Sequence, residues 1–454
     1  MLGDGWRAEF AEALGAFREA HPDVRSVDVF AVNLNGIPHG KRVPVAALET
    51  LAQGGTMPFQ ISLAGLDVFC HDVPESGIAM EIGDPDGAFV PLPRTLRLVP
   101  WGERQVGQLQ GMFGTRAADA LMPFDPRGVL LRVLERAGAL GFRPVVALEL
   151  EFYLIDPAEP APPRDPRTGQ RLAGEQILNL DVLHTFEPVL EAISDAAAAL
   201  GVETGTTLSE FGPGQFEINL PHCDAARACD EMVALRRTIR AVARRHGLDA
   251  TFMAKPFGGQ SGSGQHIHLS LERDGANAFD EPGEPVGPLL SGAVAGLAET
   301  AGDVFLMLAP HLNSYRRHVP GSYAPTGANW GLDNRGAAIR VPATRGAGAR
   351  IEHRIAGADA NAYLLAAAVV AGALHGIAAG LEPAPPTTSE AGSDAPRFPT
   401  HWDEACERFA GSQFVADWMG QEFRRIFAAI KRQERASFLS RVTDVELGAY
   451  LRTL

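Results

Sequence analysis

The sequence predicts an α+β fold in which a small N-terminal domain precedes a much larger one. The chain has 454 residues, more than one compact core usually holds. Short strand-like stretches separated by Gly and Pro turns run from Phe59 to Pro100. After about residue 120, strand patterns alternate with alanine-rich helical patterns. We therefore expect one domain over residues 1–115 and a second over residues 116–454.

The expected N-terminal domain begins with an amphipathic helix over residues 5–20. Residues 27–34, VDVFAVNL, have the composition of a strand, which Asn35-Gly36 would end with a turn. A helix-like stretch follows near residues 45–53, and the segment LRLVPW over residues 96–101 closes the strand-rich region. This mixture predicts a small α+β unit.

The larger domain is expected to open with an amphipathic helix that runs to about Leu140. Asp125 is placed to cap this helix, and Pro126 occupies its first turn. Two further helical stretches, at about residues 403–416 and 420–436, are expected to close the chain.

Three other segments of the larger domain have a marked composition. Residues 156–172 and 381–399 are rich in Pro and Gly, so we expect surface insertions there, the second a mobile flap or an excursion of the chain. Residues 362–379 form the most apolar stretch of the chain, but Gly and His interrupt it. We therefore expect a buried helix rather than a membrane span.

The composition is that of an ordinary globular enzyme, with 46% hydrophobic and 21% charged residues. The formal net charge of −15 argues against a nucleic-acid partner. The N-terminus carries acids and no apolar run, which is unlike a signal peptide. The four cysteines are too scattered for a disulfide framework. These features predict a cytoplasmic enzyme without a membrane or nucleic-acid partner.

Five predicted strands place polar side chains on one face and apolar side chains on the other, because residues two apart in a strand share a face. The polar members are Glu149 and Glu151; Gln215, Glu217 and Asn219; His266, His268 and Ser270; Arg340; and Arg350, Glu352 and Arg354. A single strand with this pattern is as often part of a solvent-exposed sheet face as part of a ligand-binding face. Five strands rich in Glu, His and Arg favour a ligand-binding face instead.

The residue types on this face indicate what it binds. Two carboxylates that share a strand face repel each other unless a cation lies between them. Glu and His are ligands of divalent metals, and Arg pairs with phosphate and carboxylate groups. The face is therefore predicted to hold divalent metal ions together with polyanionic ligands.

Two loops are candidates to join this face. Glu210 lies seven residues before Glu217, a spacing that puts the two on opposite faces of a straight strand, but the intervening residues 211–214 can bend the chain and turn Glu210 inward. Residues 257–264, FGGQSGSG, precede His266 without the GK[ST] of a phosphate loop. This segment is either a flexible turn or a ligand cradle.

Several of these segments resemble the glutamine synthetase superfamily. KPFGGQSGSGQHIHLSL is similar to its ATP-binding signature, and NSYRRHVPG, DNRGAAIR and RIEHRIAGADAN resemble its later blocks in the same order. The ELEF and GPGQFEINL segments match its earlier blocks. The resemblance spans residues 120–380 strongly and the N-terminal region loosely. It implies a β-grasp N-terminal domain and a catalytic domain built on a curved antiparallel sheet with helices.

The resemblance implies a carbon–nitrogen ligase that consumes ATP and forms ADP. ATP would phosphorylate the side-chain carboxylate of glutamate, and an amine would displace the phosphate. Two or more Mg²⁺ or Mn²⁺ ions would assist at each active site. One would be held by Glu151, Glu210 and Glu217, and the other by Glu149, His266 and Glu352.

The same resemblance assigns the remaining polar residues. Arg317 and Arg354 would pair with the substrate carboxylate beside Gly262, and Arg335 would contact the transferred phosphoryl group. Arg317, Arg335 and Glu352 would thus take part directly in catalysis. ATP would be bound by His268, Ser270, Arg340 and Arg350. The family assembles into homo-oligomeric rings, typically dodecamers, with active sites between subunits.

The amine is where this sequence departs from ammonium-using members of the family, which carry two acids for the ammonium ion. Counted from Arg317, the position of one acid is occupied by Tyr323, and the region of the other offers Gln60 or Ser62, with Asp67 nearby. The sequences of the segments GKRVP, SYRRHVPG and IEHRIAGADAN are similar to those of the γ-glutamylpolyamine (γ-glutamylputrescine) synthetase branch, which acts in polyamine catabolism. Putrescine or another polyamine is therefore the favoured amine.

Three alternatives stay open at this point. The protein could be an ammonium-using glutamine synthetase, or a γ-glutamyl ligase for a monoamine such as methylamine, ethanolamine or isopropylamine. A non-catalytic scaffold is disfavoured because every metal and phosphate position that aligns keeps its expected residue type.

Overall fold

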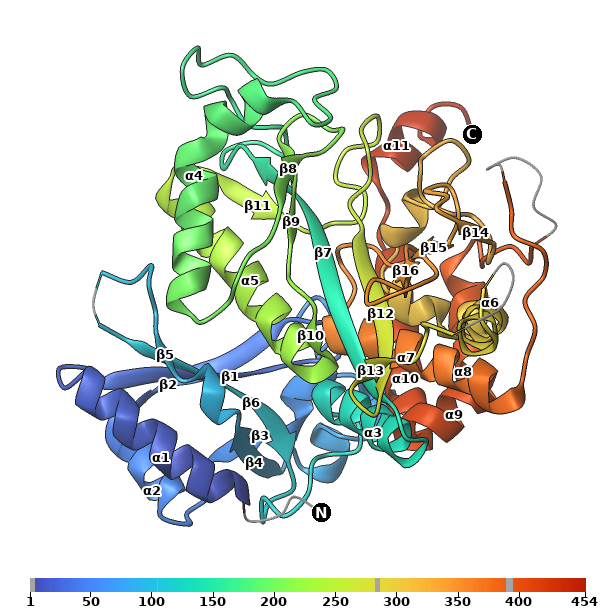
Figure 1. Cartoon of the computed structure of the whole chain (residues 1–454). Helices are drawn as coiled ribbons and strands as arrows, with labels where there is room; N and C mark the ends of the chain where they lie inside the picture. Colours follow the sequence, from blue (N-terminus) through green and yellow to red (C-terminus); the bar gives the residue numbers. More distant parts are fainter. Residues whose placement is uncertain (1–4, 104, 282–285, 389–394) are drawn as a thin grey trace.

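A sheet of six strands and a sheet of ten strands organise the chain, with helices packed against both (Figure 1). The computed structural model describes residues 5–103, 105–281, 286–388 and 395–454. The predicted α+β class is confirmed. The domain boundary between residues 115 and 116 stays a prediction.

The six-stranded sheet is formed by the N-terminal part of the chain. Its strand order is β2-β1-β6-β4-β3, with β5 beside β6; β1 and β6 run parallel, and the other pairs are antiparallel. Helix α1 packs on it through Phe10, Leu14 and Phe17. The elements are α1 (Gly5–Ala20), β1 (Ser26–Val32), β2 (Pro38–Pro44), α2 (Val45–Ala52), β3 (Pro58–Gln60), β4 (Asp86–Pro91), β5 (Arg97–Leu98) and β6 (Gly107–Gly114).

The ten-stranded sheet carries the long strand β7 through the middle of the molecule (Figure 1). Its order is β14-β15-β16-β12-β7-β9-β8, with β10 and β11 also beside β7 and β13 beside β12. Its strands are β7 (Arg143–Ile155), β8 (Thr207–Ser209), β9 (Gln215–Asn219), β10 (Cys223–Asp224), β11 (Asp249–Thr251), β12 (Gln265–Arg273), β13 (Ala276–Asn277), β14 (Trp330–Leu332), β15 (Ile339–Ala343) and β16 (Arg350–His353).

Helices lie on both flanks of this sheet. Figure 1 shows α4 and α5 on one side and the C-terminal helices on the other, with α5 next to the six-stranded sheet. They are α3 (Pro126–Ala139), α4 (Leu180–Ala199), α5 (Ala225–Arg245), α6 (Pro288–Leu308), α7 (Ala362–Ala379), α8 (Trp402–Gly411), α9 (Gln413–Met419), α10 (Gln421–Leu439) and α11 (Asp444–Tyr450).

The predicted helices over residues 5–20 and 45–53 and the strand near residues 27–34 are confirmed, as is α3, whose N-cap Asp125 accepts a hydrogen bond from the backbone N–H of Gly128 at 2.6 Å. The expected run of short strands from Phe59 to Pro100 is confirmed only in part, because short 3-10 helices lie between β3, β4 and β5. The prediction for the C-terminus was wrong in detail. The segment expected as one helix is two, because Ser412 adopts an extended conformation and caps α9. Helix α11, which was not predicted, begins with a capping box between Thr443 and Glu446.

The apolar helices α6 and α7 pack against each other in the core. Each is long and apolar enough to cross a membrane, but 72% and 78% of their most apolar windows are buried inside the protein. The helices approach so closely that a Cβ atom on Gly376 would lie 2.0 Å from the carbonyl oxygen of Gly292. The predicted buried helix over residues 362–379 is confirmed.

The two predicted insertions are irregular where the structure describes them. Residues 156–172 form turns closed by an isolated bridge between Arg164 and Arg171. Residues 381–388 and 395–399 lie in no helix or strand, and residues 389–394 of the expected flap fall outside the described residues.

A buried ion pair within the C-terminal helix α10 bonds to two loops of the N-terminal region. Lys431 and Glu434 are fully buried, and Lys431 Nζ lies 2.9 Å from the Glu434 carboxylate. Glu434 also accepts hydrogen bonds from the Asn35 side chain at 2.7 Å and from the Val68 N–H at 3.1 Å. Neutralising one partner would leave the other charge buried and unpaired.

We therefore expect Glu434→Gln to lower the stability of the protein by about 3 kcal/mol, because Lys431 loses its counter-charge. The double variant Lys431→Met/Glu434→Gln should recover most of this loss, since the glutamine oxygen can still accept from Asn35 and Val68. Thermal unfolding of the three proteins measures the effect. Equal losses in the single and double variants would contradict this account.

Candidate active site

The strand register brings the predicted polar residues onto one face of the ten-stranded sheet. Glu149 lies opposite His266 on β12 and opposite Asn219 on β9, and Glu151 lies opposite Glu217. On the other side of β12, His268 lies opposite Glu352, which is also opposite Arg340 on β15. Directly paired residues project from the same face of a sheet. The opposite face carries fully buried apolar residues: Leu148, Leu150, Ile218, Ile267 and Ile351.

A tight hairpin after β8 turns Glu210 toward this face. The Glu210 N–H donates to the Gln215 carbonyl at 2.9 Å, and Gly214 has a φ of +79°. A side chain at Gly212 would collide with the Tyr153 hydroxyl, 1.9 Å from the Cβ position. The turn therefore requires glycine, and it places ligand atoms of Glu151, Glu210 and Glu217 within 4.8 Å of one another.

A second concentration of ligand atoms lies around Glu149. Its carboxylate is 3.1 Å from His266 Nδ1 and 2.9 Å from His268 Nε2. Ligand atoms within 4.8 Å of one another form two trios here, Glu149 with Glu217 and His266, and Glu149 with His268 and Glu352. The trio expected from the family resemblance divides between them, because His266 and Glu352 belong to different trios.

Burial and mutual repulsion make these carboxylates a strong cation site. Burial raises the pKa of Glu217 to about 9, helped by the nearby charges of Glu151, Glu149 and Glu210. Burial and the Glu151 charge raise the pKa of Glu210 to about 7. Burial also opposes ionisation of Glu149, but hydrogen bonds from the two histidines outweigh it and lower its pKa. A divalent cation would relieve this repulsion, and the oxygen-rich donor set suits Mg²⁺ or Mn²⁺.

Arginines border the acidic face. The Glu352 carboxylate accepts a hydrogen bond from Arg340 Nη1 at 2.5 Å and another from Arg354 Nη1. Burial alone would raise the pKa of Glu352, but the adjacent Arg354 charge helps to lower it to about 2. Within the described chain, the Nε atoms of Arg340 and Arg354 are buried without a hydrogen-bond partner. They are donors available to an anionic ligand.

The glycine-rich loop packs directly on Arg317. Arg317 is 5% exposed and donates to the Ile355 carbonyl at 2.7 Å. A Cβ atom on Gly262 would lie 2.9 Å from Arg317 Cγ, and one on Gly264 would lie 2.7 Å from Arg317 Nη2. The glycines therefore allow the loop backbone to approach a buried guanidinium, as a ligand cradle requires.

A cavity of about 800 Å³ adjoins Glu149, and its lining includes three of the residues predicted to serve ATP: His268, Ser270 and Arg350. Arg350 Nε donates to His268 Nδ1 at 3.2 Å. The volume is within the range of nucleotide-sized ligand sites. Arg335 does not line this cavity and is exposed in the turn between β14 and β15.

The sequence did not identify the groups that hold Glu151 in place. Its carboxylate accepts hydrogen bonds from the Gly264 N–H at 2.7 Å and from the Gln215 amide at 3.4 Å. Gln215 alternates with Glu217 on β9, and this alternation was its only signal. The role of the Gly264 amide depends on the loop conformation and has no sequence signal.

A sequence profile described as the catalytic domain of glutamine synthetase matches residues 123–450. The chain belongs to the glutamine synthetase family. The acidic face, the arginines and the adjoining cavity lie within the matched segment.

Individual relatives extend this family assignment over nearly the whole chain. The gamma-glutamylputrescine synthetase of Escherichia coli is 36% identical over 98% of this chain and 95% of its own length. The glutamate–isopropylamine ligase of a Pseudomonas species is 31% identical over 96% of both chains. The solved structure titled "GmaS/ADP complex-Conformation 1" has a TM-score of 0.84 at 28% identity, over 97% of this chain and 99% of that chain.

This member of the glutamine synthetase family is a carbon–nitrogen ligase. Ligases of the family use ATP, glutamate, an amine and divalent metals. The carboxylate and histidine groups of this chain fit such metals, because they gather mutually repelling carboxylates and other metal ligands at one place.

The acidic face predicts an unusual pH dependence of the metal-free protein. Glu210 and Glu217 bind protons more tightly folded than unfolded, so their contribution to stability is full below about pH 4.5 and is lost as the pH rises through about 7 and 9. We expect a loss of several kcal/mol between pH 5 and pH 9, and Mg²⁺ or Mn²⁺ should abolish most of it.

Thermal unfolding across this pH range, with and without metal, measures the effect. Glu217→Gln should flatten the metal-free profile and weaken metal stabilisation, whereas Glu272→Gln, at an exposed ion pair with Arg143, should leave both unchanged. A wild-type profile that is flat without metal would refute the assignment.

Proposed function

We propose that this ligase joins the γ-carboxylate of glutamate to an organic amine, with putrescine or another polyamine favoured, and forms a γ-glutamyl amide. The observation that carries the proposal is the convergence of acids and histidines from five segments with arginines and a nucleotide-sized cavity on one sheet face. The named activities of the two curated relatives support the choice of an organic amine.

The proposed reaction has two steps. A glutamate carboxylate oxygen attacks the γ-phosphorus of ATP, ADP leaves, and γ-glutamyl phosphate forms. The amine nitrogen then attacks the acyl carbon, the carbon–oxygen bond to phosphate breaks, and the amine nitrogen gives up a proton. Such phosphoryl transfer depends mainly on positioning and charge neutralisation.

We assign the acids to metal binding. Glu151, Glu210 and Glu217 would hold one ion, and Glu149, His266 and Glu352 would hold a second, with His268 beside it. Bound Mg²⁺ or Mn²⁺ would neutralise phosphate charge. The chain itself fixes the ligands, since the Gly264 amide orients Glu151 and two arginines orient Glu352.

We assign the arginines to the anionic substrates. Arg317 and Arg354 would bind glutamate carboxylate beside Gly262. Arg340 and Arg350 would bind ATP together with His268 and Ser270. Arg335 would reach the transferred phosphoryl group from its exposed turn.

An aromatic pair supports an organic amine over ammonium. Tyr323, at the position of a family acid, stacks on Phe211 with ring centroids 5.2 Å apart and an interplanar angle of 18°. Phe211 directly follows Glu210 of the acidic face. Tyr323 is 66% exposed and has a φ of +58°, so its loop holds the ring outward. Aromatic rings suit an alkyl chain and a cationic amine better than they suit a small hydrated ion.

Asp67 and Gln60, which lie in the region of the second family acid, are engaged in local contacts. Asp67 is 1% exposed, and its carboxylate accepts hydrogen bonds from the N–H groups of Phe69 and His71 at 2.8 and 2.9 Å. Gln60 is bonded to Asp84 at 3.3 Å. Asp67 therefore has a local structural role, which supports a substrate other than ammonium.

We also propose a homo-oligomeric ring, a dodecamer, with active sites between subunits, acting in polyamine catabolism in the cytoplasm. Helix α11 and its flanks support association, because they expose Val442, Val445, Tyr450, Leu451 and Leu454. Apolar clusters of this kind commonly mark protein–protein contacts.

An amine panel tests the proposed function. With glutamate, ATP and Mg²⁺, phosphate release should be strongest with putrescine or spermidine and at least about tenfold weaker with ammonium, methylamine, ethanolamine or isopropylamine. Glu352→Gln should abolish release with every amine. A monoamine as best substrate would change the substrate within the ligase class. Ammonium as the best substrate would refute the organic-amine proposal. No phosphate release with any amine of the panel would favour a non-catalytic scaffold protein.

Tyr323→Glu should move the amine preference toward ammonium. The new carboxylate restores a charge at the flap position and removes the aromatic wall, so we expect kcat/KM for ammonium to rise about tenfold and that for the preferred amine to fall by a similar factor. Tyr323→Phe, which keeps the ring, serves as the matched control. An unchanged preference in Tyr323→Glu would exclude Tyr323 from the amine site.

A further inference from the structure

A pocket of about 430 Å³ lies between the loop joining β1 to β2 and one face of helix α5, and arginines dominate its charged lining. Arg236, Arg237, Arg240 and Arg244 project from α5 at spacings that place them along one side of a helix. Four guanidinium groups in one pocket are conspicuous in a chain of net charge −15. We call it the α5 basic pocket.

Three of the four guanidinium groups have no carboxylate partner among the described residues. Arg244 pairs with Asp249 at 3.3 Å. Arg236 donates to the Ala360 carbonyl at 2.9 Å, and Arg236 and Arg240 lie over the ring of Phe252 at 4.8 and 5.0 Å. Arg237 lies 4.0 Å over the ring of Phe30, and its Nη1 is buried without a hydrogen-bond partner.

The acids nearest to these arginines are already engaged elsewhere. Asp28, which faces Arg237, binds Arg42 through two hydrogen bonds of 2.6 and 3.0 Å. Asp249, which faces Arg240, binds Arg244. Asp359, which faces Arg236, accepts from the Ser314 hydroxyl at 2.6 Å through one oxygen, and its other oxygen has no hydrogen-bond partner among the described residues, so it offsets only part of the arginine charge. The pocket therefore keeps an excess of positive charge.

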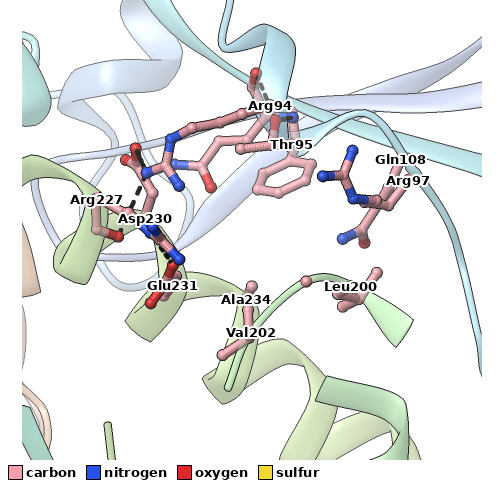
Figure 2. A pocket seen from close by; sticks show the side chains of 13 residues that line it. Arg94, Thr95, Arg97, Gln108, Leu200, Val202, Arg227, Asp230, Glu231 and Ala234 are labelled. Atoms are coloured by element: carbon pink, nitrogen blue, oxygen red, sulfur yellow. Dashed lines mark hydrogen bonds and ion pairs between the residues drawn. The ribbon is translucent and has the colours of Figure 1, made fainter. Parts of the chain in front are cut away.

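A neighbouring pocket provides an internal comparison. It lies between the N-terminal sheet and the same helix and includes Arg94 and Arg227 (Figure 2). There Arg94 is bound by the buried Asp230, and Arg227 is bound by Glu231 at 2.6 Å. Figure 2 shows these pairs on one side of that pocket. Among the described residues, two of the three arginines that line this neighbouring pocket have an acid partner, whereas in the α5 basic pocket only one of the four does.

The uncompensated charge has a physical cost that a ligand would remove. Burial lowers the pKa of Arg236 and of Arg237 to about 10. Such desolvated cations, adjacent on one helix, gain most from an anion that several of them share. Planar guanidinium groups match the paired oxygens of phosphate and carboxylate groups.

We propose that the α5 basic pocket is a binding site for a small dianion, a phosphate ester or a dicarboxylate, separate from the ATP and glutamate sites. Arg237 and Arg240 contact the anion, and Arg236 and Arg244 border it. The pocket volume accommodates a metabolite rather than a macromolecular segment.

Isothermal titration of the full-length protein with AMP, pyrophosphate or succinate, in the presence of saturating Mg²⁺ and ADP, tests this proposal. We expect one site per chain for at least one of these probes. AMP or pyrophosphate binding alone identifies a phosphate site, and succinate binding alone identifies a dicarboxylate site. Because glutamate and amine are absent, the result does not depend on the proposed ligase substrate.

Variants locate the site. Arg237→Met and Arg240→Met should each weaken binding at least about tenfold while keeping apolar packing. Arg245→Met, on the same helix but outside the pocket, and Arg350→Met, in the ATP cavity, should leave it unchanged. Arg240→Met should also keep the thermal midpoint of the ligand-free protein and lose the rise in midpoint caused by the anion.

Three results would overturn the proposal. The first is no binding of any probe at millimolar concentration. The second is binding that Arg350→Met abolishes and Arg237→Met does not, which would place the anion in the ATP cavity. The third is loss of oligomeric state in both Arg237→Met and Arg240→Met without any anion binding by the wild-type protein, which would make the arginines a contact between copies of the chain.

Discussion

The carboxylates on one face of the ten-stranded sheet repel one another, and the surrounding fold must hold them together against this repulsion. Glu149, Glu151 and Glu217 cannot separate, because β7 and β9 fix them in direct register, and the hairpin turns Glu210 toward Glu151 and Glu217. Without a cation, part of this charge is relieved by bound protons, as the raised pKa values of Glu210 and Glu217 show. A rigid scaffold that concentrates negative charge in this way attracts cations and is therefore suited to metal and phosphate chemistry.

The apolar side of the same strands supplies that rigidity. Leu148, Leu150 and Ile267 are fully buried, so a slip of one residue in register would expose them and bury the acids. The C-terminal helices add a second constraint, since the Lys431–Glu434 pair joins α10 to the loop after β1. Moving the acids out of place would therefore also disrupt the packing of the apolar core.

The alternation of residues predicted the acidic face well, because period-two patterning depends only on local geometry. It placed Glu149, Glu217, His266 and Glu352 on one side before any contact was known. It could not divide His266 and His268 between ligand groups, because that depends on side-chain directions across three strands. The break at Ser412 also escaped prediction, since both flanking segments are helical in pattern and a single cap decides the boundary.

Hydrogen bonds connect the α5 basic pocket to the loop that contacts Arg317. Asn313 lines the pocket, and its side chain bonds both the N–H and the carbonyl of Lys255, at 2.8 and 2.9 Å. Lys255 in turn donates to the Gln260 carbonyl within the glycine-rich loop. Asp359, also in the pocket, holds Ser314, three residues before Arg317. An anion bound to Arg236 would weaken the electrostatic attraction of this arginine for Asp359 and would thus act on residues that position the loop, which gives charge in the pocket a short physical route to the proposed glutamate site.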